Sequence, residues 1–387
     1  MALSIIPRLN YHYIFKDLII SLSGLFKKNF NYDELKFMYD VDEVLFFNHA
    51  RTAMRIALNS LDLKKDATVG LMGFNCLTVM NSIKSAGFNL LFIDVTDDFQ
   101  IDMSDFRNKV EKMDALIINH MFGIPNSTIL DIRKDFPTLP VIEDCAHSFM
   151  TNINEKPTGT FGDISVFSFG KGKFPSVGDG GFMIVNNKNY LNSVTLQYEK
   201  LSVVSFWEEA RNIILSVILS LMHIPFIYKN ITLSLFKEMD NKKDLVGKYS
   251  TSEKSYYKSN LNLLMSKIKI IHQLLDRQKT NGDILRKEIN AKFVAYNGEY
   301  NFFMLPIYQE KRDEFIKFCS ENGVEVGKHF SKSIKWAKEF GYVDGNCPNA
   351  ERIVKVIVTV PTHCNMNKKQ IEWIKKTLGS SSFCILK

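Results

Sequence analysis

Residues 162–185 read GDISVFSFGKGKFPSVGDGGFMIV and carry the strongest structural signal in this 387-residue chain. The segments 163–169 and 182–185 are apolar runs, which predict two strands. The loop between them is rich in glycine and contains Lys171 and Lys173. Glycine permits unusual dihedral angles and a close approach of the backbone to a ligand, and a folded core has no need of these lysines. We therefore expect a ligand-binding loop here.

Apolar runs alternate with helical patterns upstream of this loop. The predicted strands are 68–72, 90–95, 115–119 and 141–143, and the predicted helices are 54–58, 77–86, 103–112 (with Asp102 as N-cap) and 127–134. Such alternation is typical of a mostly parallel sheet covered by helices on both faces. Ligands bind at the carboxyl ends of the strands in such a sheet. Glu143, Asp144 and the loop after Phe169 should therefore lie together.

The pattern changes after about residue 245. It predicts a long helix at 268–289, strands at 302–307 and 354–360, a helix at 313–322 and a final helix from Lys368. A chain of this length suits a large domain and a smaller one. We predict a large α/β domain over residues 1–245 and a small α+β domain over residues 246–387.

Two apolar segments lie outside this scheme. Residues 213–228 read IILSVILSLMHIPFIY, which is shorter than the roughly 20 residues of a membrane span. We expect a buried helix or a contact between subunits, with a helix lying in a membrane surface as the alternative. Weak membrane contact through 213–228 therefore stays open. Residues 15–26 form a short amphipathic stretch, predicted as a helix packed on the body.

The amino-acid composition limits the kinds of binding partner that we expect. The net charge is +7, but the basic residues are scattered along the chain, which does not favour nucleic-acid binding. The six cysteines form no CxxC pair and no metal-ligand cluster appears, so we expect no metal. Cysteines spaced this widely in a long chain are typical of reduced thiols, which indicates a cytoplasmic protein.

Two patterns predict an anionic ligand that carries a ring. Residues 48–53, NHARTA, open a helix, where N-terminal N–H groups and Arg51 can bind an anion. Residues 141–147, VIEDCAH, place Asp144 at the end of a buried strand, where an acid can keep a ring nitrogen protonated. His147 could reach the same ring. Taken singly, each of these residues has a plain alternative as a solvated, capping or packing side chain.

The loop itself predicts covalent chemistry. A lysine in a confined pocket loses its proton more readily, becomes nucleophilic and can condense with an aldehyde. Lys173 fits this role, and Ser168 offers a hydroxyl to a phosphate. Lys171, two residues earlier in the same loop, is the rival lysine.

Taken in order, these pieces resemble the DegT/StrS family of pyridoxal-phosphate sugar aminotransferases. The resemblance rests on the EDxAH box at 143–147, the GD…SF strand, a lysine five residues after Ser168 and an acid-Gly-Gly motif six residues after the lysine. HMFG at 120–123 and PNAE at 348–351 look like further family blocks. The likeness covers roughly residues 40–375.

The resemblance implies an aspartate-aminotransferase-like fold (type I), a homodimer and pyridoxal 5'-phosphate as cofactor. It also implies an amino group moved from glutamate to a keto-sugar, a nucleotide-linked 4-keto-6-deoxyhexose, for surface polysaccharide or glycoside biosynthesis. Carried over by residue, Lys173 is the catalytic Schiff-base lysine, Asp144 pairs with the ring nitrogen and His147 lies next to the ring. The phosphate contacts fall to Ser168 and to the turn of Ala50, Arg51 and Thr52.

Three departures mark a divergent branch. The phosphate turn reads His49-Ala50-Arg51 where the family is usually Ser-Gly-Thr-like. Cys76 replaces the usual ring-stacking aromatic, so that stacking falls to Phe74 or is absent. The cross-subunit Asn–Arg block is not recognisable around 253–259. On the substrate side, His329 resembles the histidine of a family His-aromatic pair.

Two other functions stay open. The first is a lyase that dehydrates a keto-sugar on the same fold, but its relatives replace the lysine by histidine, and Lys173 is retained. The second is a non-catalytic membrane-surface scaffold that uses residues 213–228. A scaffold need not bind the cofactor, so cofactor binding separates it from the aminotransferase.

Overall fold

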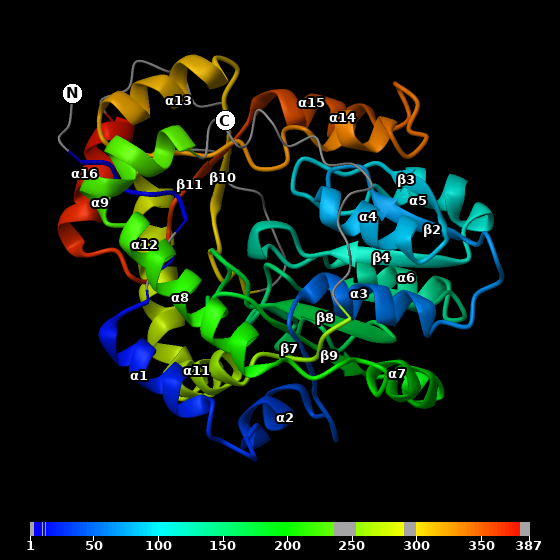
Figure 1. Cartoon of the computed structure of the whole chain (residues 1–387). Helices are drawn as coiled ribbons and strands as arrows, with labels where there is room; N and C mark the ends of the chain where they lie inside the picture. Colours follow the sequence, from blue (N-terminus) through cyan, green and yellow to red (C-terminus); the bar gives the residue numbers. More distant parts are fainter. Residues whose placement is uncertain (1–3, 10, 12, 236–252, 290–298, 380–387) are drawn as a thin grey trace.

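A seven-stranded sheet organises the chain in the computed structural model, which describes residues 4–9, 11, 13–235, 253–289 and 299–379 (Figure 1). The strand order is β1-β9-β8-β5-β4-β2-β3. Its strands are β1 (Leu45–Phe47), β2 (Thr68–Met72), β3 (Asn89–Ile93), β4 (Ala115–Asn119), β5 (Val141–Asp144), β8 (Ile164–Ser168) and β9 (Gly181–Val185). The pairs from β3 through β8 are parallel, and β9 pairs antiparallel with both β8 and β1. The predicted mostly parallel sheet is confirmed.

Helices lie on both faces of this sheet (Figure 1). They include α3 (Ala50–Asn59), α4 (Leu77–Ser85), α5 (Met103–Lys109), α6 (Thr128–Asp135) and α7 (Leu191–Tyr198), with α2 (Asp33–Tyr39) before β1. Short 3-10 turns are η1 (Val110–Lys112), η2 (Met121–Gly123) and η3 (Lys188–Tyr190), and β6 (Asn152–Ile153) pairs with β7 (Lys156–Pro157). The central strands β4 and β5 are buried along their whole length, because helices cover both faces of a parallel sheet. Asp102 caps α5 as predicted, by accepting from the N–H groups of Ser104 and Asp105.

The later part of the chain forms a second, smaller layer. Its antiparallel strands are β10 (Leu305–Tyr308) and β11 (Ile357–Val360), and its helices are α11 (Lys258–Ile268), α12 (Ile271–Ile289), α13 (Arg312–Glu321), α14 (Ser333–Lys338), α15 (Pro348–Val356) and α16 (Lys368–Gly379). The helix predicted at 268–289 corresponds to α12, and α11 before it was not predicted. The strand predicted at 354–360 is shorter, because α15 continues to Val356 with Ala350 and Ile353 buried. The predicted boundary at 245/246 lies outside the described residues and stays a prediction.

Two further helices are α1 (Phe15–Gly24) and α8 (Phe206–Met222). Helix α8 is followed by α9 (Pro225–Ile227) and the π-helical turn η4 (Tyr228–Thr232). Helix α1 packs on the body as predicted. The sequence analysis allowed for a buried helix here, but α8 is only partly buried: Ile214, Ile218 and Leu221 are exposed. No single helix among the described residues is long and apolar enough to cross a membrane; α8 and 225–235 pass together by length and composition but are bent by 76°.

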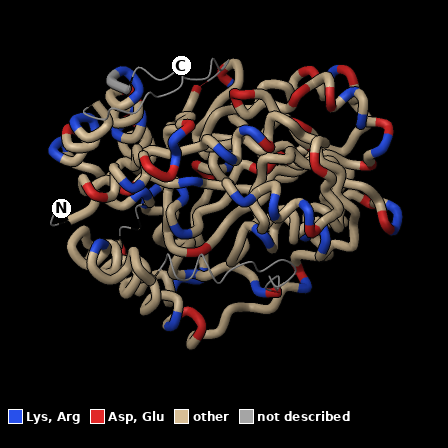
Figure 2. The backbone as a smooth tube through the Cα atoms, turned by 90° about the horizontal axis from the view of Figure 1, so that it is seen from above, with Lys and Arg blue, Asp and Glu red and all other residues tan. Residues whose placement is uncertain are grey.

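Charge is distributed over the surface. Figure 2 shows Lys and Arg interspersed with Asp and Glu around the molecule. A nucleic-acid groove requires basic residues gathered on one face. This distribution therefore gives no support to a nucleic-acid partner.

Candidate active site

A cavity of about 220 Å³ opens at the carboxyl ends of β4, β5 and β8. The residues of the predicted site that line it are Ala50, Arg51, Cys76, Asp144, His147, Ser168 and Lys173. They come from segments more than 120 positions apart, and the parallel register brings them to one edge of the sheet. The structure therefore brings these seven predicted residues together around one cavity.

Asp144 ends β5 and is held in place by two donors. The Asn119 amide donates to its Oδ2 at 2.6 Å, and the Ala146 N–H donates to its Oδ1 at 3.0 Å. Burial raises the pKa of Asp144, although the Ala146 N–H, Lys173 and Asn119 act in the opposite direction. The carboxylate is thus fixed in orientation in a site where a positive partner stabilises its charge.

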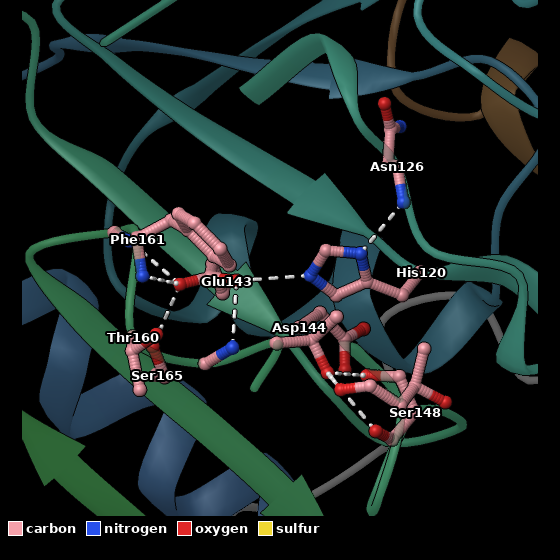
Figure 3. A network of polar contacts seen from close by, with 12 residues as sticks. His120, Asn126, Glu143, Asp144, Ser148, Thr160, Phe161 and Ser165 are labelled. Carbon is pink, nitrogen blue, oxygen red and sulfur yellow. Dashed lines mark hydrogen bonds and ion pairs between the residues drawn. The ribbon is translucent and has the colours of Figure 1, made fainter. Parts of the chain in front are cut away.

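Glu143 points to the other face of β5, because successive strand side chains alternate. Figure 3 shows it inside the sheet, hydrogen-bonded to His120, whose other ring nitrogen accepts from the Asn126 N–H. The Glu143 carboxylate also accepts from the N–H groups of Gly159, Phe161 and Gly162 at 2.6–2.8 Å. Glu143 therefore shapes the turn before β8 rather than the cavity.

One group of possible metal ligands exists among the described residues. His120, Glu143 and Cys145 bring their ligand atoms within 4.8 Å of one another. The histidine and the carboxylate are already hydrogen-bonded to each other and to backbone N–H groups, and burial raises the pKa of the Cys145 thiol well above its ordinary value. A protonated thiol is a poor metal ligand, so this cluster reads as a packed hydrogen-bonding unit.

The loop after β8 holds Lys173 against the cavity. The Lys173 N–H donates to the Gly170 carbonyl at 3.0 Å, and the loop closes through Phe169 and Gly180, which are hydrogen-bonded at 2.9 Å. Gly172 and Gly180 adopt φ of +76° and +144°, which side chains rarely allow. Burial lowers the pKa of Lys173, although Cys76 and Asp144 act in the opposite direction. This shift favours the neutral, nucleophilic amine.

His147 forms one wall of the cavity within a stack of aromatic rings. Its ring lies 4.5 Å from that of Phe303 and 5.8 Å from that of Phe330, at interplanar angles of 25° and 13°. Its Nδ1 accepts from the Phe122 N–H at 3.2 Å. Burial, followed by the charge of Lys173, holds the pKa of His147 well below its usual range. His147 is therefore a neutral, flat ring beside Lys173.

The N-terminus of α3 forms the cationic end of the cavity. Arg51 lines the cavity, and its buried Nε has no hydrogen-bond partner among the described residues. His49 lies 3.6 Å from Asp179, but burial, with Arg51 and Lys171 nearby, lowers its pKa to about 3. The charge at this end therefore comes from Arg51, as an anion would require.

Thr52 and His329 lie differently from the other predicted residues. The Thr52 side chain is buried beneath the turn, and its hydroxyl donates to Asn48 at 3.4 Å. His329 contacts Thr359 through Nδ1 at 3.0 Å, and its neighbour Phe330 lines the cavity in its place. Neither residue is among those lining the cavity, and their roles in binding stay predictions.

Phe74 is not positioned to stack on a ring in the cavity. Phe74 is fully buried among the rings of Phe99, Phe122 and Phe330, and it does not line the cavity. Cys76 lines the cavity at the N-cap of α4.

Sequence reasoning missed the polar chain behind Asp144. Asn75 donates to Asn119 at 2.5 Å, and Ser333 of the smaller layer accepts from the Asn75 N–H at 2.7 Å. Asn119 ends a predicted strand that neighbours β5, and that position is the one signal in the sequence that could have found it. The contact with Ser333 spans 258 positions and has no local signature.

The chain matches the model of the DegT/DnrJ/EryC1/StrS aminotransferase family over residues 18–213 and 264–378. It is 32% identical over 145 residues to a GDP-perosamine synthase of Escherichia coli O157:H7, an alignment that covers 36% of this chain and 40% of that protein. A second GDP-perosamine synthase, from Vibrio cholerae, is 29% identical, with 50% of its length covered. The chain thus spans at most half the length of these two relatives.

Other similarities extend over nearly the whole chain. A UDP-4-amino-4,6-dideoxy-N-acetyl-beta-L-altrosamine transaminase of Campylobacter jejuni is 22% identical over 88% of this chain and 85% of that protein. The crystal structure of the sugar aminotransferase CalS13 from Micromonospora echinospora superimposes with a TM-score of 0.74, at 16% identity, over 97% of this chain and 100% of that one. This likeness confirms the predicted fold. Because the family model matches most of the sequence, the chain belongs to the DegT/DnrJ/EryC1/StrS aminotransferase family.

Proposed function

We propose that this enzyme uses pyridoxal 5'-phosphate to transfer an amino group from glutamate to a keto-sugar carried on a nucleotide. One observation carries the proposal: Lys173, with a lowered pKa, and Asp144, with a fixed orientation, line the same cavity. A nucleophilic amine and a buried carboxylate at one site are what a cofactor with an aldehyde and a basic ring nitrogen needs.

The residues of the cavity fit this cofactor. The buried Arg51 Nε without a hydrogen-bond partner, at a helix N-terminus, suits a phosphate. Ala50, through its backbone N–H, and Ser168, through its hydroxyl, would complete the phosphate contacts. Asp144 would face the ring nitrogen, and His147 would lie beside the ring. Cys76 lines the cavity at the position where the family resemblance expects a stacking aromatic ring.

The cofactor supplies an aldehyde that binds the amino group and a ring that withdraws electrons from the reacting carbon. Lys173 would hold the cofactor through its aldehyde, and the Lys173 amine, when free, would take and return the proton at the substrate carbon. Asp144 would keep the ring nitrogen of the cofactor protonated. The rings of Phe303, Phe330 and His147 restrict water around Lys173.

The nucleotide-sugar relatives and one feature of the smaller layer support a sugar acceptor. A keto-acid is bound well by a bidentate arginine. Arg352 on α15 is instead at the surface, where it pairs with Asp97. A nucleotide-linked 4-keto-6-deoxyhexose, made for surface polysaccharide or glycoside biosynthesis, is the acceptor that we propose.

A half-reaction panel tests the function. Protein loaded with pyridoxal phosphate should lose its cofactor absorbance band on adding glutamate and regain it on adding a keto-sugar. A scaffold would not bind the cofactor at all, and a lyase would not respond to glutamate. If pyruvate or oxaloacetate restores the band faster than every keto-sugar tested, the proposed acceptor is wrong.

Three further assignments belong with this proposal. We propose a homodimer, as in the family resemblance, and a division into residues 1–245 and 246–387. We also propose a cytoplasmic location, which the five described cysteines support, since all are free thiols.

A further inference from the structure

Helix α1 buries polar and small residues and exposes apolar ones, the reverse of an ordinary surface helix. Its buried residues are Asp17, Ser21 and Gly24, whereas large apolar side chains point outward. The outward side chains follow a helical spacing: Phe15, Ile19, Leu22 and Phe26, all at least 43% exposed. A surface helix normally buries its apolar stripe, so the outer face of α1 is built for contact with something apolar.

Helix α8 shows the same inversion. It buries Glu209, Asn212 and Ser216, and exposes an apolar row that continues beyond the helix. The row comprises Phe206, Trp207, Ile214, Leu215, Ile218, Leu221, Ile224 and Phe226, each at least 41% exposed. A patch of this kind on a folded protein marks an interaction site.

The two helices form one layer on α11. From α8, Glu209 accepts from the Ser259 hydroxyl at 2.5 Å, and Asn212 donates to Asn260 at 2.9 Å. From α1, the Ile20 carbonyl accepts from Asn262 at 2.6 Å. A Cβ on Gly24 would lie 2.7 Å from the Asn262 Cβ, so α1 approaches α11 closely.

The helices also contact each other, because Ser220 near the end of α8 hydrogen-bonds the Tyr13 backbone just before α1. Figure 1 shows both helices on the side of the molecule remote from β3. Asp17, Glu209 and Asn212 have hydrogen-bond or ion-pair partners on the inner side, and the apolar sides of both helices point away from α11.

The charged residues around these two helices indicate which kind of partner would cover their apolar faces. The most exposed charged residues of α1, the turn after it and α8 are Lys16, Lys27, Lys28 and Arg211, and the half-exposed Glu208 is the acidic exception. The acidic Asp17 and Glu209 are buried, and Glu208 is paired with Lys254 at 3.1 Å. A two-fold contact between copies would set the same basic patch against itself. An anionic lipid surface complements both the apolar rows and the basic rim.

We propose that the outer faces of α1 and α8, continued through Phe226, dock the enzyme on the surface of an anionic membrane. The 76° bend after α8 suits helices that lie along the surface rather than cross it. The family model matches no residue from 214 to 263, a stretch that includes the exposed row from Ile214 to Phe226. The proposal stands independently of the aminotransferase chemistry, since neither helix contributes to the lining of the cavity.

Flotation with lipid vesicles tests the proposal on the full chain. The wild type should float with phosphatidylcholine vesicles that contain phosphatidylglycerol, and less with pure phosphatidylcholine. Replacing Ile214, Ile218 and Leu221 together by Gln keeps good helix formers on an exposed face, and should lower the bound fraction at least about tenfold. The matched control, Leu196→Gln with Val343→Gln, changes exposed apolar residues elsewhere and should bind like the wild type.

Circular dichroism and the oligomeric state in solution accompany each variant. An unchanged oligomeric state in the triple variant, with vesicle binding lost, supports membrane docking. A wild type that does not float overturns it. A triple variant that dissociates into smaller assemblies, from a wild type that ignores vesicles, assigns the surface to a second copy of the chain instead.

Discussion

The Asn119 side-chain amide donates a 2.6 Å hydrogen bond to Oδ2 of Asp144, across two neighbouring parallel strands. A donor to the ionised form lowers the pKa of a carboxylate, and burial already raises that of Asp144. Asn119→Ala should therefore raise the pKa of Asp144 further. Since the ionised carboxylate is needed, the acid limb of the pH profile for the glutamate half-reaction should move to higher pH. The exposed Asn346→Ala is the control, and an unmoved acid limb would contradict this positioning role.

Asp144 itself should be far more sensitive. Asp144→Ala removes the charge that holds the ring nitrogen protonated, and the half-reaction should slow by about two to four orders of magnitude. Stopped-flow absorbance measures this rate, and cofactor binding by the same variant shows that the site still forms. An Asp144→Ala enzyme with a rate near that of the wild type rules the role out.

Lys173, and not Lys171, should carry the cofactor. Reduction with borohydride should fix the cofactor to the peptide that contains Lys173, and Lys173→Ala should take up no label. Lys171 is exposed and lies 3.7 Å from Asp179, so Lys171→Ala is the matched control and should label normally. Peptide mass mapping decides, and a label on Lys171 would show that the assignment is wrong.

Arg51 should set the affinity for the phosphate group. Arg51→Ala should weaken cofactor binding by about ten- to a hundredfold, the range expected for a lost hydrogen bond to a charged group. Arg51→Lys should fall between, since it keeps the charge and loses the forked geometry. Fluorescence titration of cofactor-free protein measures the dissociation constant. Arg352→Ala, at the surface, should change nothing; equal effects of the Arg51 and Arg352 changes would remove the phosphate role.

The sequence allowed the central sheet to be predicted because its signals are local. Strands such as 115–119 are continuous apolar runs, and Asp102 is a cap read from its immediate neighbours. Lys173, Asp144 and Ser168 could be placed for a related reason, since each follows a strand at a fixed spacing. The residues that align them could not be placed. Asn75 and Phe330 act through contacts between layers, which depend on packing rather than on any spacing along the chain.

The inverted helices illustrate a second limit. An apolar run at 213–228 is consistent with burial or with exposure, and composition alone does not distinguish them. The structure distinguishes burial from exposure, because it shows which way the polar residues within and before the run face. Ser216 and Asn212 face inward, so Ile214 and Ile218 must face outward.

Glu143 should matter for stability rather than for chemistry. Burial alone would raise the pKa of Glu143, but His120 and the N–H groups of Gly162 and Gly159 outweigh it, and the pKa is lowered. A carboxylate with a lowered pKa in the folded state contributes stability above its unfolded pKa, about 4.3. That contribution is lost as the pH falls through the folded pKa.

Glu143→Gln is the sharpest test of this contribution. Both carboxylate oxygens accept from N–H donors, with His120 and Gly159 on Oε2 and Phe161 and Gly162 on Oε1. In either orientation the new amide group therefore places its own N–H against other donors. The substitution should cost about 3 kcal/mol of unfolding free energy at neutral pH, measured by urea denaturation, and the difference from the wild type should shrink as the pH is lowered. The exposed Glu339→Gln should stay within about 0.5 kcal/mol of the wild type. A Glu143→Gln protein equally close to the wild type would show that this buried carboxylate does not hold the turn before β8.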